Sequence, residues 1–208
     1  LQSLNSMKNG TEYLVLNQNA DRSQTVDKYS YETGEKIATL VSSNDIKLPI
    51  RNYILSEDEQ QMLIVSQRIP IFRRSTNSMV HIYDLKKKTL TPLSDQLVRS
   101  ASFSPDGNKV GFVFANNLYY KDLTTGQTIQ VTDDGVTNQL INGVTDWVYE
   151  EEFSLVRAYE FSPDGSQIAF ISFDEREVPE FSMDVYGNEL YQKPYVFKYP
   201  KAGEKNSI

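Results

Sequence analysis

Residues 102–112 (SFSPDGNKVGF) and residues 160–170 (EFSPDGSQIAF) of this sequence can be laid over each other without a gap. Their shared S-P-D-G centre is suited to a tight turn, because Pro presets φ at the first central position, Asp suits the second and Gly closes the turn. The apolar stretches on either side indicate the two strands of a hairpin. A degenerate earlier copy, ILSEDEQQMLI, occupies residues 54–64. The chain is therefore built from repeated hairpins.

A second repeated element follows each hairpin, and it has the pattern strand, short polar turn, strand. It occurs at residues 29–37 (YSYETGEKI), 82–90 (IYDLKKKTL) and 120–128 (YKDLTTGQT). The whole unit then holds four short strands, and its Ser56, Ser104 and Ser162 are spaced by 48 and 58 residues. A four-stranded period of about 40–50 residues is typical of a β-propeller blade. Since no long stretch has a helical period, the sequence predicts an all-β propeller.

The 208 residues hold about four such blades, which we place at residues 1–48, 49–97, 98–155 and 156–208, the last incomplete. This number favours a part of a larger ring over a closed four-bladed one. The terminal blades of a partial ring expose apolar faces and strand edges. We therefore expect the isolated chain to self-associate, with a face-to-face homodimer as the simplest arrangement.

Composition excludes several classes of function. The net charge of −7 is unsuited to nucleic-acid binding, and no apolar run reaches the ~20 residues that span a bilayer. The absence of cysteine rules out disulfides, thiolate metal sites and cysteine nucleophiles. Acidic pairs at 133–134 and 174–175 fit turns. We predict neither a metal nor a cofactor.

The longer of the two spacings contains the stretch DWVYEEEF, residues 146–153. Insertions on a repeat scaffold commonly build its binding face. Three adjacent carboxylates between aromatic residues are therefore a candidate cation site. The alternative is a solvated acidic turn.

These residues resemble a known family. The run TDWVYEEEF at 145–153, followed by EVP at 177–179 and YPKAG at 199–203, is similar to the dipeptidyl peptidase IV family of prolyl oligopeptidase-type serine peptidases. The resemblance covers residues 50–208. It implies an eight-bladed propeller packed on a C-terminal α/β-hydrolase domain. It also implies release of N-terminal dipeptides whose second residue is Pro or Ala.

The resemblance also implies roles for individual residues. Glu151 and Glu152 would bind the substrate's α-ammonium, and an ungapped count back from residues 83–85 (YDL) places the arginine that holds the substrate carbonyl at Arg73. Arg74 is the alternative. Weaker candidates are Glu150, and the aromatic residues Trp147 and Tyr149, which either line a substrate pocket or pack within the fold.

The chemistry of such a site can be argued from the residue types. An α-ammonium carries three N–H donors and is largely charged at neutral pH. Two carboxylates accept two of these donors, and the cation relieves their repulsion. An acylated amine leaves them unpaired, which costs several kcal/mol. If Asp146 caps a helical turn, Glu150 and Glu151 also lie near its positive end. Because two extended residues span ~7 Å, this anchor selects the bond after the second residue.

No catalytic triad can be assembled from this chain. None of its ten glycines belongs to a G-x-S-x-G motif, and its only histidine, His81, is interpreted as an ordinary strand residue. The resemblance places the catalytic Ser, Asp and His downstream. We expect the chain alone to be inactive, with further blades and the hydrolase domain as its partners and peptides with a free N-terminus as substrates.

Two other functions stay open. The chain could belong to a non-enzymatic propeller that serves as a binding or scaffold module, or to a tripeptidyl peptidase of the same family. The expected location is periplasmic or exported. Residues 176–186 do not fit the blade pattern and predict a long excursion between strands. No role follows for the wider segment 176–195.

Overall fold

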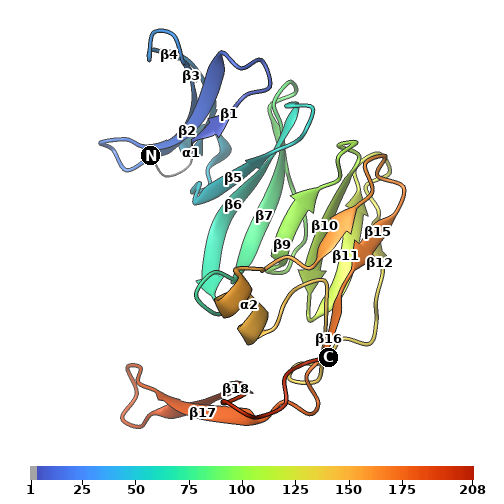
Figure 1. Ribbon diagram of the computed structural model, residues 1–208. Coiled ribbons are helices and arrows are strands. Elements are labelled where there is room, and N and C mark those ends of the chain that lie inside the picture. Colours follow the sequence, from blue (N-terminus) through green and yellow to red (C-terminus); the bar gives the residue numbers. More distant parts are fainter. Residues whose placement is uncertain (1–3) are drawn as a thin grey trace.

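The computed structural model describes residues 4–208 and is an assembly of antiparallel sheets (Figure 1). Three successive sheets have four strands each, ordered along the chain. The first holds β1 (Asn5–Ser6), β2 (Glu12–Gln18), β3 (Gln24–Ser30) and β4 (Lys36–Ser42). The second holds β5 (Asn52–Leu55), β6 (Gln61–Pro70), β7 (Thr76–Asp84) and β8 (Thr89–Pro92). The third holds β9 (Arg99–Phe103), β10 (Lys109–Phe114), β11 (Asn117–Asp122) and β12 (Thr128–Gln130). The prediction of an all-β fold is confirmed.

The remaining residues form a fourth unit and an arm. In the fourth unit β13 (Leu140–Asn142) pairs with β16 (Ser172–Asp174), and β14 (Tyr159–Phe161) pairs with β15 (Ile168–Phe170). The arm is the hairpin of β17 (Glu180–Val185) and β18 (Lys193–Lys198). Two short helices complete the described elements, α1 (Ser43–Ile46) and α2 (Trp147–Phe153).

The predicted range 98–155 contains more than one sheet. Its first part is the complete third sheet, which ends at Gln130, and its last part is β13 and helix α2. Helix α2 therefore lies between the first two strands of the fourth unit. The extra residues in the longer repeat spacing form this connection and not a strand of the third sheet.

The repeated turns have the same hydrogen bonds in each copy. In the third sheet the Ser104 hydroxyl donates to Asp106 at 2.5 Å, and the N–H of Gly107 donates to the Ser104 carbonyl at 2.9 Å. Gly107 has φ +72°, which favours glycine. The turn that starts at Ser162 repeats both bonds, and so does the degenerate turn that starts at Ser56. The hairpins predicted from the sequence are confirmed.

Neighbouring sheets pack face to face through alternate residues of one strand. In β6, Met62 and Ile64 join the core between the first two sheets, whereas Leu63 and Val65 join the core between the second and third. This is the period-2 alternation of a strand that is buried on both faces. Stacking of successive sheets by both faces is the packing of propeller blades, and Figure 1 shows the sheets side by side.

The excursion predicted at residues 176–186 is part of the β17–β18 arm, which stands apart from the sheets (Figure 1). Its outer half carries exposed apolar side chains: Met183, Val185, Tyr186, Leu190, Tyr191, Tyr195 and Val196. Its base packs under helix α2, as described below. No helix within residues 4–208 is both long enough and apolar enough to cross a membrane.

Candidate functional site

Helix α2 is a short excursion closed at its base. The N–H of Thr145 donates to the Val156 carbonyl at 3.2 Å, and the Thr145 hydroxyl donates to the Leu155 carbonyl at 2.6 Å. Asp146 is the N-cap, because its carboxylate accepts the N–H of Tyr149 at 2.9 Å. The expected capping role of Asp146 is confirmed. The helix ends at Phe153, and its C-cap residue Ser154 has a left-handed backbone with φ +57°.

The helix separates three carboxylates that are adjacent in the sequence. Successive residues of an α-helix point about 100° apart. Glu150 accordingly points into the protein and is fully buried, Glu151 is half-buried, and Glu152 is exposed. The repulsion expected from the EEE sequence is therefore reduced by geometry. Each of the three glutamates has a different environment and can serve a different purpose.

Glu150 connects the helix to the loop between β6 and β7. Its Oε1 accepts the backbone N–H of Arg74 at 2.6 Å and that of Ser75 at 2.8 Å. A fully buried carboxylate with these two donors is not accessible to a substrate. Of the three glutamates, Glu151 and Glu152 are the two whose side chains solvent can reach.

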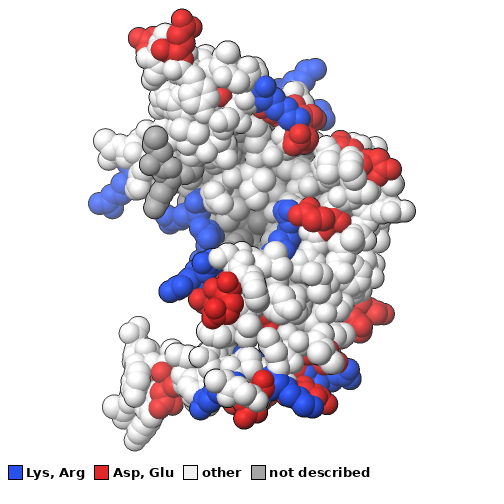
Figure 2. Space-filling view, in the orientation of Figure 1, with Lys and Arg blue, Asp and Glu red and all other residues white. Residues whose placement is uncertain are grey.

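Arg73 lies at the tip of the same loop and faces helix α2. Its Nη1 is 3.4 Å from Oε2 of Glu151, and the two side chains are 70% and 17% exposed. Arg74 is also exposed, but its recorded contact with the helix is through its backbone N–H. In Figure 2 an acidic group at the position of α2 lies directly beside basic side chains. This open face therefore presents carboxylates that can bind a cation beside a guanidinium that can bind an oxygen.

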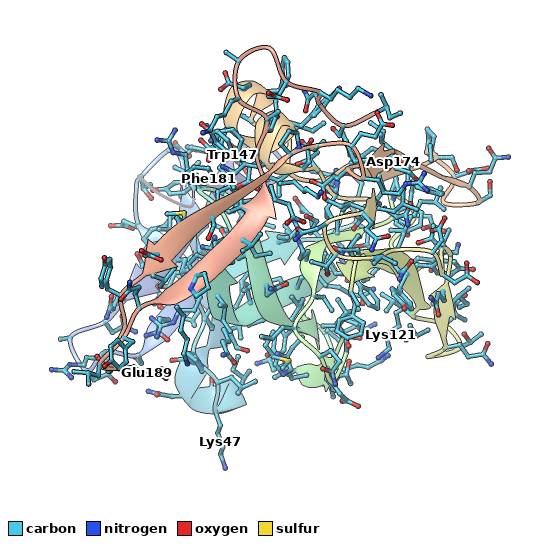
Figure 3. All side chains as sticks on the ribbon, turned by 90° about the horizontal axis from the view of Figure 1, so that it is seen from below. Lys47, Lys121, Trp147, Asp174, Phe181 and Glu189 are labelled. Carbon is cyan, nitrogen blue, oxygen red and sulfur yellow. The ribbon has the colours of Figure 1, made fainter. Side chains whose placement is uncertain are left out.

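The two aromatic candidates make packing contacts. The ring centroids of Trp147 and Tyr199 are 4.4 Å apart, and those of Tyr199 and Phe181 of the arm are 5.5 Å apart. Figure 3 shows Trp147 beside the base of the arm, near Phe181. Tyr149 contacts Phe173 of β16 at 4.9 Å and Phe153 at 5.4 Å. Trp147 thus joins α2 to the arm, and Tyr149 joins α2 to the fourth unit.

A cavity of about 500 Å³ lies among the arm, the loop that carries Phe72 and the start of α2. It is lined by charged residues for which the sequence predicted no functional role, among them Arg99, Glu175 and Lys198. Glu175 belongs to the acidic pair at 174–175, whose residue types fit a turn. Arg99 lies five residues before the S-P-D-G turn that starts at Ser104. No spacing in the sequence brings these residues together, so only the tertiary structure reveals the cluster.

Glu175 is buried near other charges of this cavity. Burial raises the pKa of its carboxyl from 4.5 to about 7, and the negative charge of Asp146 acts in the same direction, whereas Lys198 and Arg99 oppose the shift. The folded protein therefore binds more protons than the unfolded chain between these two values. The Glu175 carboxyl therefore contributes to stability below pH 4.5, and this contribution is lost as the pH rises to about 7.

Replacing Glu175 by glutamine should therefore make the protein less sensitive to rising pH. We expect the melting temperature of Glu175→Gln to match that of the wild type at pH 5 and to exceed it at pH 8, because the wild type then holds a buried charge. Thermal melts of the full-length protein at both pH values measure this. Glu177→Gln removes an exposed carboxylate two positions away and is the matched control. A difference that is the same at pH 5 and pH 8 contradicts the assignment.

Within residues 4–208, no three or more His, Cys, Asp and Glu side chains are grouped to hold a metal ion. His81 is in the middle of β7, where burial lowers its pKa. This agrees with the interpretation of His81 as an ordinary strand residue.

Comparisons with known proteins find the same similarity over most of the chain. The family model described as dipeptidyl peptidase IV (DPP IV) N-terminal region matches residues 56–208. Among curated proteins, prolyl endopeptidase FAP of Bos taurus is 34% identical over 202 residues, which are 96% of this chain and 26% of that protein. A probable dipeptidyl-aminopeptidase B of Chaetomium globosum is 35% identical over 207 residues, which are 92% of this chain and 21% of that protein.

A solved structure agrees with the fold. The crystal structure of Porphyromonas gingivalis dipeptidyl peptidase 4 superimposes with a TM-score of 0.88 at 37% sequence identity, covering 98% of this chain and 29% of that one. The chain thus spans about a quarter of the length of the curated relatives that it matches.

Proposed function

Because this chain belongs to the dipeptidyl peptidase IV N-terminal region family, we propose that it is the substrate-recognition part of a serine exopeptidase that releases N-terminal dipeptides. The observation that carries the proposal is the arrangement of Arg73 and Glu151 on one open face, 3.4 Å apart. Further blades and an α/β-hydrolase domain of the full-length protein would supply the rest of the active site, including the catalytic Ser, Asp and His.

The carboxylates of Glu151 and Glu152 hold the α-ammonium of the substrate. On helix α2, Glu151 is half-buried and Glu152 is exposed, so a carboxylate oxygen of each residue can reach a cation above the helix. The Arg73 guanidinium donates to the carbonyl oxygen of the substrate's penultimate residue, which is the second from its N-terminus. In the absence of substrate Arg73 is the counter-ion of Glu151. An incoming α-ammonium takes over that role, which frees the guanidinium for the carbonyl.

The anchor determines which bond is cut. Two extended residues span about 7 Å, so a nucleophile at that distance from the glutamates meets the second peptide bond. Because the substrate is held both at its α-ammonium and at the carbonyl of its penultimate residue, the bond to be cut is oriented toward the nucleophile. Pro or Ala as the second residue is part of this proposal. Release of tripeptides is the alternative within the family, and it requires a nucleophile one residue farther away.

The proposal is tested with the full-length protein and a Gly-Pro chromogenic substrate, first with a free amine and then with an acetylated one. Acetylation removes the charge and leaves the two carboxylates without their partner, which costs about 2–5 kcal/mol, or about 30-fold or more in kcat/KM. Mass spectrometry of a longer peptide then separates dipeptide from tripeptide release. Equal cleavage of both chromogenic substrates excludes the amine anchor, and no cleavage of either favours a binding or scaffold module.

We propose that the protein forms a homodimer, since the arm carries a group of exposed apolar side chains that a monomer would leave in water. Light scattering of the chain at micromolar concentration decides this, and a monodisperse monomer is the contrary result. We also propose a periplasmic or exported location, which cell fractionation tests.

A further inference from the structure

We infer that Glu150 is a positioning residue that sets the spacing between Arg73 and Glu151. It does so by tying the β6–β7 loop to helix α2. The inference rests on the proposed function of this site, because it concerns how the two substrate-binding elements are kept in register. Glu150 itself does not contact the substrate.

The contact joins two distant parts of the chain. The Glu150 Oε1 atom accepts the N–H groups of Arg74 and Ser75, at 2.6 and 2.8 Å, across sequence separations of 76 and 75 residues. The loop is also closed on itself, because the N–H of Ile71 donates to the Ser75 carbonyl at 3.0 Å. A compact loop held at its base by a buried carboxylate has little freedom to move relative to the helix.

Within residues 4–208, no other contact between these two elements is comparably strong. The Arg73–Glu151 ion pair involves a side chain that is 70% exposed, and exposed ion pairs contribute little. A hydrogen bond to a charged acceptor is worth more, especially where water is excluded. Glu150 is fully buried and makes two of them. The position of Arg73 is therefore set by Glu150 and not by Arg73's own ion pair.

The charge of Glu150 has a half-buried counter-charge. The guanidinium of Arg99 interacts electrostatically with both Glu150 and Glu175. A buried carboxylate without an opposite charge would be strongly disfavoured. Arg99 thus offsets part of the cost of burying Glu150, and a carboxylate is a better acceptor than an amide oxygen for two N–H donors at one oxygen. Glutamine at position 150 would be a weaker acceptor, and its amide nitrogen or oxygen would take the place of Oε2, a buried atom for which the described residues supply no hydrogen-bond partner.

The first experiment is a double-mutant cycle in the full-length protein. Glu150→Gln should lower kcat/KM for the free-amine Gly-Pro substrate by about 10-fold or more, the loss expected for weakened hydrogen bonds to a charged acceptor. If Glu150 acts through Arg73, the same change in an Arg73→Ala background should lower kcat/KM by less than about 3-fold, because coupled residues are not additive. An equal loss in both backgrounds, or no loss, overturns the inference.

A matched control separates positioning from general destabilisation. Asp27 is a buried carboxylate of the first sheet with hydrogen bonds to Thr25, Thr39 and Asn17. Asp27→Asn should lower the melting temperature without changing kcat/KM. The Glu151→Gln/Glu152→Gln variant tests the proposed function itself. If it loses the amine preference while Glu150→Gln has no effect, only the inference fails; if it keeps the preference, both fail.

A second measurement needs no variant. The Arg74 and Ser75 amides lie in a surface loop, yet both donate to a buried carboxylate. Hydrogen exchange of the wild-type protein should therefore show slow exchange at these two amides and fast exchange at an exposed turn amide such as that of Glu32. Fast exchange at residues 74 and 75 overturns the inference even if the Glu150 variant does not fold.

Discussion

Replacing Glu151 and Glu152 together by glutamine in the full-length protein should abolish its preference for a free N-terminus. The substitution keeps the shape of both side chains but removes both negative charges, one of which pairs with Arg73. A charge pair from which the bound substrate excludes water, and which loses one partner, costs about 2–5 kcal/mol, which corresponds to a 30-fold to more than 1,000-fold fall in kcat/KM. The measurement is cleavage of the Gly-Pro substrate with a free and with an acetylated amine.

The ratio of the two rates is more informative than either rate. We expect the variant to cleave the free substrate about as poorly as the wild type cleaves the acetylated one. Glu32→Gln/Glu35→Gln makes the same change of charge in an exposed turn of the first sheet, and it should leave the ratio unchanged. If the ratio survives in the Glu151/Glu152 variant, these residues are a solvated acidic helix end and the amine is recognised elsewhere.

The second large effect is expected at Gly111 in strand β10, where the third sheet packs against the fourth unit. A Cβ atom at this position would lie 2.6 Å from a ring carbon of Tyr159 and 3.0 Å from one of Phe161. The Tyr159 ring cannot move away easily, because it is buried and its hydroxyl donates to the Ser100 carbonyl at 2.6 Å. Gly111→Val should therefore destabilise the fold by about 3 kcal/mol, at the upper end of overpacking effects.

For a unit of this size, that loss lowers the melting temperature by roughly 6–12 °C. Gly111→Ala adds one carbon where valine adds three, so its effect should be intermediate. Gly187, at the tip of the arm, has no neighbour within 4 Å of its hypothetical Cβ, and Gly187→Val is the control. Equal melting temperatures for the Gly111 and Gly187 variants would contradict the packing of β10 against Tyr159.

The sequence alone was sufficient for the repeated unit. Turn chemistry is local: Ser, Pro, Asp and Gly within four positions specify the hairpins at Ser104 and Ser162. The Ser–Asp bond also forms at Ser56, where Glu57 and Glu59 replace Pro and Gly. The apolar stretches on either side of each turn are also local, and they predicted strands that the sheets confirm. The Glu motif could be selected because it interrupts this regularity. Its capping by Asp146 followed from the preference of helix ends for such side chains.

The roles within the motif depend on the tertiary structure. Three adjacent glutamates look equivalent in a sequence, but a helix turns them by about 100° each, and the direction that is buried depends on what packs against the helix. The partners of Glu150 are backbone N–H groups 75 and 76 residues away, which no side-chain pattern records. Trp147 likewise meets Tyr199 of the chain after the arm. The local chemistry of the sequence determined the blades and the candidate residues, whereas the packing of distant segments decided which carboxylate is buried and which two lie toward solvent.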